Sequence, residues 1–227
     1  MKKVVAFDFD QTSAMTLELW TEIKSAVADG MGLPLSPEQN TAIYFSWDKE
    51  YIGWGKNLEE QKAIYRAYYA PRVESEWQKR EWIDRVALFP GMKDVMEELS
   101  ETYRLMIVTS RDMYSTSAAL GNSGVLRLFD GIIASDAGRS YPDKPHPCML
   151  YEAMARAGVD PSGIVMIGDT PGDIGMGKAA GARTIGAGYG GYVSLNDLAA
   201  LKPDCILRSV RDIPKIPELV SGLLNSR

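Results

Sequence analysis

Two aspartates, Asp8 and Asp10, form an Asp-x-Asp pair directly after a short apolar run, residues 4–7. Two carboxylates this close repel each other unless a cation lies between them. Because hard divalent cations bind oxygen ligands, the pair suggests a site for a metal such as Mg²⁺, with the hydroxyl of Thr12 close behind. The apolar run (VVAF) has no helical spacing, which predicts a strand buried on both faces of a parallel sheet.

Hydroxyl and lysine side chains that could bind an anion follow later in the chain. Thr109 and Ser110 come directly after the apolar run 105–108, where a hydroxyl and the N–H groups of a helix start make a cradle for an anion. Lys144 stands in residues 141–147, a loop that three prolines stiffen, so its cation is held in place. Each feature alone is also typical of a helix cap or a solvated loop.

A second pair of aspartates follows the fourth apolar run of the chain, residues 164–167. Asp169 is separated from residues 164–167 by one glycine, and Asp173 stands where it can cap the next helix. If the sheet has the usual right-handed crossovers, Asp169 lies beside Asp8. Because parallel strands end at one edge of a sheet, we expect four carboxylates, two hydroxyls and one lysine to converge there.

In this order, the residues resemble the motifs of the haloacid dehalogenase superfamily. The four motifs are matched by residues 8–12 (Asp-Phe-Asp-Gln-Thr), by Thr109, by Lys144, and by Asp169 with Asp173. The match covers residues 3–12 and about 90–227. The insert after the first motif resembles the helical cap of the subgroup that contains phosphoglycolate phosphatase. The resemblance implies a phosphatase for a small phosphorylated metabolite.

The resemblance also implies roles for these residues. Asp8 would attack phosphorus to form an aspartyl-phosphate, and Asp10 would protonate the leaving oxygen and later activate water. The implied Mg²⁺ ligands are the Asp8 carboxylate, the Asp10 carbonyl and Asp169, with Asp173 in support. The implied substrate contacts are Thr12, Thr109, the Ser110 N–H and Lys144.

Two departures from the family pattern stand beside the first motif. Gln11 occupies a position where the family often has glycine, and residues 13–15 (Ser-Ala-Met) replace its usual Leu-x-Asp stretch. Because every phosphate-handling position is present, we expect these departures to affect substrate choice and the hinge of the cap rather than the reaction.

The remaining apolar runs predict the fold. Short runs at residues 132–134, 164–167 and 183–185, and a weaker one at 205–207, alternate with helical segments. This alternation predicts an α/β fold with a doubly wound parallel sheet, a Rossmann-like core. Gly158 and Gly181 are expected just past the ends of two of its helices.

The gap between the first two strands is too long for an ordinary connection and predicts an inserted helical domain. We place the core in residues 1–14 and 89–227, and the insert in residues 15–88. Ser36 and Asn57 are expected to cap helices, Pro71 to end one, and residues 73–86 to form the last.

Aromatic residues are concentrated in this insert, which holds all five tryptophans. Val73, Trp77 and Ile83 recur at roughly helical spacing and are expected to pack in its core. Residues 47–56 have little periodicity and hold Trp47, Trp54 and Lys56. These aromatics fit either core packing or a surface that faces substrate, with Lys56 as its cation.

Composition limits the partners. The 227 residues are 45% hydrophobic and carry a formal charge of −5, with no basic stripe, so we expect a folded protein with small-molecule partners and no nucleic acid or membrane. Without an apolar leader or a membrane-length segment, the cytoplasm is the expected location. Cys148 and Cys205 predict ordinary buried thiols. The sequence does not distinguish a monomer from a homodimer.

Other functions compete with phosphate hydrolysis. Residues 186–191 fit Gly-x-Gly-x-x-Gly, the pattern of a dinucleotide-binding oxidoreductase, although the helix that follows is short. A phosphomutase of the β-phosphoglucomutase type would share every core residue and differ in the cap. The dehalogenases of the family lack the second carboxylate of the first motif, so Asp10 argues against that chemistry. A binding protein without activity is disfavoured by the full set of motifs.

Overall fold

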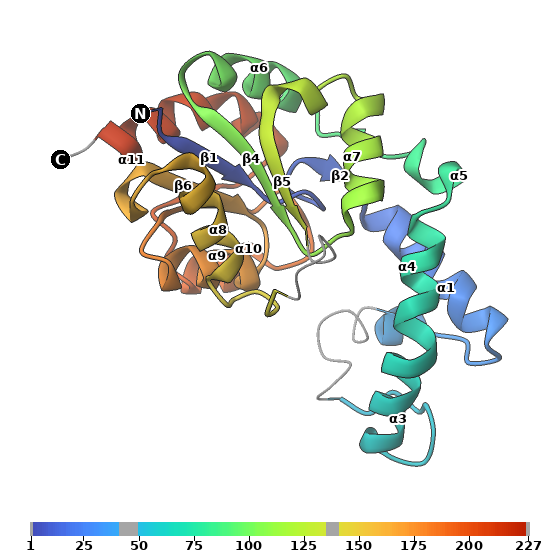
Figure 1. The fold of residues 1–227 in the computed structure, drawn as a ribbon. Helices are drawn as coiled ribbons and strands as arrows, with labels where there is room; N and C mark the ends of the chain where they lie inside the picture. Colours follow the sequence, from blue (N-terminus) through green and yellow to red (C-terminus); the bar gives the residue numbers. More distant parts are fainter. Residues whose placement is uncertain (1, 41–49, 135–140, 226–227) are drawn as a thin grey trace. The chain divides into compact units, whose positions relative to one another are not determined.

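The computed structural model describes residues 2–40, 50–134 and 141–225 (Figure 1). The chain forms two compact units: Met1–Leu17 with Val86–Arg227, the core unit, and Glu18–Arg85, the helical unit. The sequence predicts boundaries after residues 14 and 88, whereas these two units divide after residues 17 and 85. That the helical unit acts as a cap stays a prediction.

The core unit is built around a six-stranded sheet in which every pairing is parallel. Its strands are β1 (Val4–Phe7), β4 (Arg104–Thr109), β5 (Phe129–Ala134), β6 (Ile164–Gly168), β7 (Arg183–Ala187) and β8 (Cys205–Leu207). They lie in the order β5-β4-β1-β6-β7-β8. Continuous apolar runs form these strands because helices cover both faces of a doubly wound sheet. The predicted fold class is confirmed.

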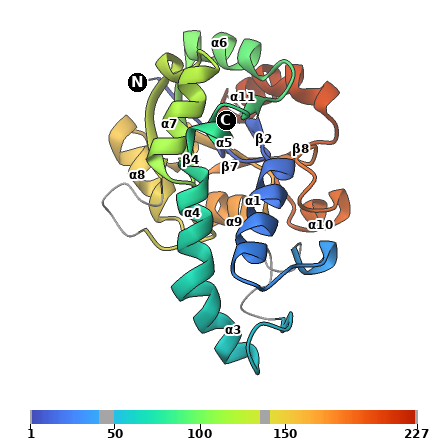
Figure 2. The ribbon, with the colours of Figure 1, turned by 90° about the vertical axis from the view of Figure 1, so that its right-hand side faces the viewer.

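Helices cover both faces of this sheet (Figures 1 and 2). The helices of the core unit are α6 (Met92–Thr102), α7 (Met113–Asn122), α8 (Cys148–Ala157), α9 (Pro171–Ala179), α10 (Leu195–Ala200) and α11 (Ile216–Asn225), with 3₁₀ turns at Leu126–Leu128, Pro161–Gly163 and Val210–Lys215. α8 and α9 pack against alternate residues of β1, β4 and β6 in one buried cluster that includes Met106, Met149 and Met166. α6 and α11 lie together on the opposite face.

The strand order determines where a site can form. β1 lies between β4 and β6, and Phe7 pairs with Ile107 on one side and with Ile167 on the other. The three strands therefore end side by side, and the loops that follow them meet at one edge of the sheet. This edge is the switch point of a doubly wound sheet, where ligands bind in open α/β folds.

Two glycines end helices of the core unit as the sequence predicts. Gly158 and Gly181 follow α8 and α9 with φ angles of 67° and 72°. These are left-handed conformations, in which a residue without Cβ is favoured.

A small second sheet was not predicted. β2 (Ala14–Met15) and β3 (Ala87–Leu88) pair antiparallel, and the Phe89 N–H extends the pairing with a hydrogen bond to the Ser13 carbonyl at 3.1 Å. It joins the two chain segments that lead into and out of the helical unit. Each strand has two residues, too few to show any alternation in the sequence.

The helical unit is made of helices, and the sequence predicts the N-caps of two of them. Its elements are α1 (Leu17–Gly30), the helical residues 37–40, α3 (Leu58–Ile64), the π-helical segment Tyr65–Tyr69, α4 (Ala70–Trp77) and α5 (Arg80–Ile83). Ser36 Oγ accepts from the Gln39 N–H at 3.2 Å, and Asn57 Oδ1 accepts from the Glu60 N–H at 3.0 Å. Both predicted N-caps are therefore present.

The prediction that Pro71 ends a helix is wrong. The chain stays helical from residue 58 to residue 77 through the π-helical segment, in which the Ala70 N–H donates to the Tyr65 carbonyl. A proline in a helix lacks an N–H and its ring crowds the preceding turn, and the wider π turn accommodates both effects. The predicted last helix, 73–86, is consequently split, because α4 ends at Trp77 and α5 begins at Arg80.

Most described aromatics of the helical unit pack within it. Trp77 is buried and lies edge-on to Trp20, with 4.6 Å between ring centroids, and Val73 and Ile83 are buried as the stripe predicts. Trp54 is also buried and packs edge-on against Tyr69 at 4.9 Å. Trp54 is thus a core residue of this unit, which favours the packing interpretation of that stretch. Trp47 lies outside the described residues.

Two predictions from the bulk sequence can be compared with the structure. Cys148 and Cys205 are free thiols, but they are half-buried rather than buried, because each begins an element, α8 and the edge strand β8. None of the helices in the described part of the chain is long and apolar enough to cross a membrane.

Candidate active site

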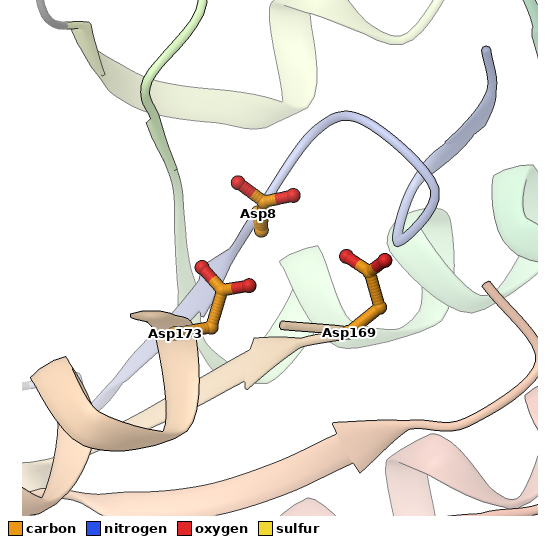
Figure 3. A group of neighbouring side chains, drawn as sticks. All are labelled: Asp8, Asp169 and Asp173. Carbon is orange, nitrogen blue, oxygen red and sulfur yellow. The ribbon is translucent and has the colours of Figure 1, made fainter. Parts of the chain in front are cut away.

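Three carboxylates meet at the switch point of the sheet (Figure 3). Asp8 directly follows β1, Asp169 directly follows β6, and Asp173 lies in the first turn of α9. All three are buried, and carboxylate oxygens from each lie within 4.8 Å of one another. The sequence predicts this convergence of Asp8 and Asp169 from the strand ends and the usual right-handed crossovers.

Lys144 places one cation among these carboxylates. Its Nζ lies 2.6 Å from Asp8 Oδ1 and 2.7 Å from Asp173 Oδ1, and it also donates to the Val108 carbonyl at 2.9 Å. An ammonium has three N–H groups, so each of them has an acceptor. Burial alone would lower the pKa of Lys144, but the charges of Asp173 and Asp8 outweigh burial and raise it.

The remaining negative charge raises the pKa of two carboxyls. Burial raises the pKa of Asp8 from 3.8 to about 8, against the opposing effect of Lys144, and the charge of Asp173 adds to the increase. Burial, followed by the charges of Asp8 and Asp173, likewise raises the pKa of Asp169 well above its usual value. One lysine is therefore too little positive charge for this cluster.

The donor set fits a divalent metal ion. Asp169 Oδ2 is buried, and no described residue donates a hydrogen bond to it. Asp8 Oδ2 likewise has no partner among the described residues, since Lys144 binds the other oxygen. Both oxygens of Asp173 are used, one by Lys144 and one by Thr170 in a capping box. The structure thus leaves oxygens of Asp8 and Asp169 open to a hard cation, with Asp173 in a supporting place.

Thr12 orients Asp169 through a hydrogen bond. It is fully buried, and its hydroxyl donates to Asp169 Oδ1 at 2.9 Å. The Tyr189 hydroxyl donates to the Thr12 carbonyl at 2.8 Å. A Cβ on Gly190 would lie 2.8 Å from Asp169 Oδ2, so the glycine is needed for close approach. In this structure Thr12 orients Asp169, and the substrate contact expected for it stays a prediction.

The structure shows how the chain accommodates Gln11, one of the two departures from the family pattern. Its φ is 57°, a left-handed conformation that favours glycine. The chain holds glutamine there with a hydrogen bond from the Thr16 N–H to Gln11 Oε1 at 3.1 Å. Nearby, the Ser13 hydroxyl donates to the Asp8 carbonyl at 2.7 Å. The turn after Asp8 is thus fixed by side chains rather than by a glycine.

The two hydroxyl residues after β4 lie at the same edge. Thr109 is buried at the last position of β4. Ser110 is exposed directly after it. Thr109 Oγ1 accepts from the Arg111 N–H at 3.1 Å, which turns the chain toward the N-terminus of α7. Their binding of a phosphoryl group stays a prediction.

Arg111 is a residue of this site that the sequence prediction missed. Its Nη1 lies 3.0 Å from Asp10 Oδ1, and its side chain is 1% exposed. Asp10 therefore pairs with Arg111, whereas Asp8 and Asp173 pair with Lys144. The one signal in the sequence is its place, directly after the Thr109-Ser110 pair and just before Asp112, which caps α7. This place alone does not distinguish a buried arginine from a solvated one.

Lys56 belongs to the helical unit. It is exposed, and its N–H donates to Glu60 Oε2. Its proposed contact with substrate therefore stays a prediction.

Comparison with known proteins now identifies the family. Residues 5–187 match the profile of haloacid dehalogenase-like hydrolases. The chain belongs to this family and is a hydrolase. It is 27% identical to phosphoglycolate phosphatase of Pasteurella multocida over 234 aligned residues, which cover 95% of this chain and 98% of that protein.

Solved structures show the same fold. A predicted phosphoglycolate phosphatase from Haemophilus somnus has a TM-score of 0.71 and 24% identity, covering 95% of this chain and 98% of its own. CbbY from Rhodobacter sphaeroides, solved in complex with phosphate, has a TM-score of 0.71 and 22% identity, covering 94% and 96%. The Pasteurella relative is thus a phosphatase by name, and the two structures show the same fold.

The glycine-rich loop has a different use from dinucleotide binding. A Cβ on Gly188 would lie 2.9 Å from the Leu207 carbonyl, and one on Gly190 would lie 2.6 Å from the Gln11 carbonyl. These glycines let the loop pack against the core and the first motif. With the family established, the oxidoreductase alternative is wrong.

Proposed function

We propose that this protein is a Mg²⁺-dependent phosphatase that hydrolyses a small phosphomonoester, of the phosphoglycolate type, through an aspartyl-phosphate on Asp8. The observation that supports it most is the contact of 2.6 Å between Lys144 Nζ and Asp8 Oδ1 at the switch point of the sheet. This contact holds the carboxylate in place and puts a cation where a phosphoryl group would arrive.

The proposed reaction has two balanced steps. An oxygen of the Asp8 carboxylate attacks phosphorus, the ester P–O bond breaks, and the leaving oxygen takes a proton from Asp10. Asp10 then accepts a proton from water as the water attacks the aspartyl-phosphate, which releases phosphate and restores Asp8. Thr109, the Ser110 N–H and Lys144 are proposed to bind the phosphoryl oxygens. Mg²⁺, when bound by Asp8, Asp169 and the Asp10 carbonyl, supplies positive charge that lets a dianion approach these carboxylates.

The helical unit is proposed to act as a cap over the strand edge. An insert directly after the nucleophile motif can exclude water and admit only small substrates. Lys56 is its proposed contact for an anionic substrate. We expect Lys56→Ala to raise KM for such a metabolite and to leave hydrolysis of an aryl phosphate unchanged.

A panel of phosphate esters tests the proposal. Phosphoglycolate, glycerol 3-phosphate, glucose 6-phosphate and p-nitrophenyl phosphate are each incubated with Mg²⁺ and with EDTA, and phosphate release is measured. We expect Mg²⁺-dependent hydrolysis by the wild type and a loss of roughly 10⁴-fold or more in Asp8→Asn, because an amide cannot attack phosphorus. Turnover that survives Asp8→Asn would contradict the mechanism. Isomerisation of glucose 1-phosphate without net phosphate release would instead support a phosphomutase.

A further inference from the structure

Arg111 is the second buried cation of the site, and its contacts differ from those of Lys144. Lys144 pairs with Asp8 and Asp173, whereas Arg111 Nη1 pairs with Asp10 Oδ1 at 3.0 Å. The Arg111 side chain is 1% exposed and that of Asp10 is 13% exposed. A buried arginine is retained where its charge and planar geometry are used, because removing it from water is costly.

Arg111 is held in one orientation by its surroundings. Its Nε donates to Ser115 Oγ at 2.8 Å, and its guanidinium lies over the ring of Phe9 at 5.4 Å. Ser115 is fixed in turn, since its hydroxyl donates to Asp112 Oδ2 and its N–H donates to Asp112 Oδ1 at 2.8 Å. The N-terminus of α7 thus anchors the arginine before any substrate binds.

This anchoring leaves one oxygen of Asp10 for chemistry. Arg111 binds Oδ1, and no described residue donates a hydrogen bond to Asp10 Oδ2. When a hydrogen bond fixes one oxygen of a carboxyl group, the other oxygen points in a fixed direction. A catalytic acid or base has to be within hydrogen-bond reach of its proton acceptor or donor, so its orientation affects the rate directly.

We propose that Arg111 is a positioning residue for Asp10: it binds Asp10 Oδ1 so that Oδ2 faces the leaving oxygen of the substrate. This inference rests on the proposed phosphatase function. Arg111 does not contact substrate in this scheme, and it acts only through Asp10. Its loss should slow the steps that need proton transfer and should leave substrate binding intact.

Substrates with different leaving groups distinguish a positioning role of Arg111 from a structural role. A nitrophenolate departs without a proton, whereas an alkoxide needs one. The value of kcat/KM depends only on the steps up to the departure of the alcohol or nitrophenolate. It therefore reports on Asp10 as an acid and not on its later role as a base. The two probes are p-nitrophenyl phosphate and the alkyl ester that the wild type hydrolyses fastest among phosphoglycolate, glycerol 3-phosphate and ethyl phosphate.

The test compares Arg111→Met, Arg111→Lys and a control, Arg104→Met. Arg104 is the first residue of β4, the strand that precedes Arg111, and it pairs with Asp130 at 3.3 Å, away from the site. We expect Arg111→Met to lower kcat/KM for the alkyl ester by about 10²-fold or more, and for the aryl ester by less than about threefold. Arg111→Lys should recover at least about tenfold for the alkyl ester, and Arg104→Met should change neither.

Several results would overturn the proposal. An equal loss on both esters indicates a collapsed site, and a raised KM with unchanged kcat indicates that Arg111 binds substrate directly. No loss on either ester also refutes it. If Arg111→Met does not fold, Ser115→Ala is used instead; it removes the acceptor of Arg111 Nε and the hydrogen bond from the hydroxyl to Asp112 Oδ2, and leaves the guanidinium in place. It must likewise lower kcat/KM more for the alkyl ester than for the aryl ester. A wild type that hydrolyses neither ester refutes the proposed function itself, which distinguishes the two failures.

Discussion

Lys144 and Asp8 form a buried ion pair, with Nζ 2.6 Å from Oδ1, at the centre of the sheet edge. Their side chains are 7% and 10% exposed, so water screens the pair little. The chain brings them together from positions 136 residues apart, and the same lysine also binds Asp173. Lys144 is therefore a structural cation as well as a proposed phosphate ligand.

Replacing Lys144 by methionine should destabilise the fold as well as abolish activity. The change leaves Asp8 and Asp173 buried without their cation, and breaking a buried pair costs about 3–5 kcal/mol. Urea denaturation measures the loss in free energy of unfolding. The control is Lys215→Met, which breaks an exposed pair with Asp212 at 2.7 Å and should cost about 0–1 kcal/mol. Similar losses in the two variants would contradict the proposed importance of burial.

Mg²⁺ should stabilise the protein through Asp169. A metal ion that binds only the folded state adds about 2.7 kcal/mol at a concentration 100 times its dissociation constant. Differential scanning calorimetry of EDTA-treated protein, with and without added Mg²⁺, measures the increase in Tm. Asp169→Asn removes the carboxylate whose Oδ2 is buried without a described partner, and it should remove most of the increase. The same Tm increase in wild type and variant would argue against this site.

Gly190→Ala should damage the site without unfolding the protein. The added Cβ would lie 2.6 Å from the Gln11 carbonyl and 2.8 Å from Asp169 Cβ, so Asp169 has to move. Overpacking of this kind costs about 1–3 kcal/mol, and we expect the Mg²⁺-induced Tm increase to shrink with it. Gly222→Ala is the matched control, because nothing lies within 4 Å of its Cβ and alanine favours a helix by about 0.5–1 kcal/mol. An unchanged Mg²⁺ response in Gly190→Ala would show that the close approach is not needed.

The strands and the carboxylates that follow them could be predicted from the sequence, because a buried parallel strand is a continuous apolar run. Asp8 and Asp169 were placed together by strand ends and crossover handedness alone. Arg111 could not be placed in this way, since a single arginine after a strand looks like any solvated charge until its burial is known. The predicted helix end at Pro71 is wrong because a π turn accommodates the proline, and a π turn has no recognisable pattern in the sequence. β2 has too few residues to show one.

Lys24 offers a prediction about pH that lies away from the catalytic residues. It is 6% exposed in α1 of the helical unit, 6.0 Å from the ring centroid of Trp20, and burial lowers its pKa from 10.5 to about 8. The folded state therefore binds the proton more weakly than the unfolded state does. Between pH 8 and pH 10.5 the unfolded state holds more protons, so the stability of the wild type should rise with pH across that window.

Lys24→Met should remove this penalty. At pH 7 the lysine is charged in both states and its full cost is present, so we expect the variant to be more stable than the wild type by about 1–3 kcal/mol. The difference should fall as pH rises through the window and should vanish above it. Urea denaturation at pH 7 and pH 10.5 measures it, with Lys79→Met as the control, because Lys79 is 51% exposed in the same unit. A stabilisation that does not depend on pH would mean that methionine gains by packing alone, and a destabilisation at pH 7 would show that the charged form of Lys24 is favoured in the fold.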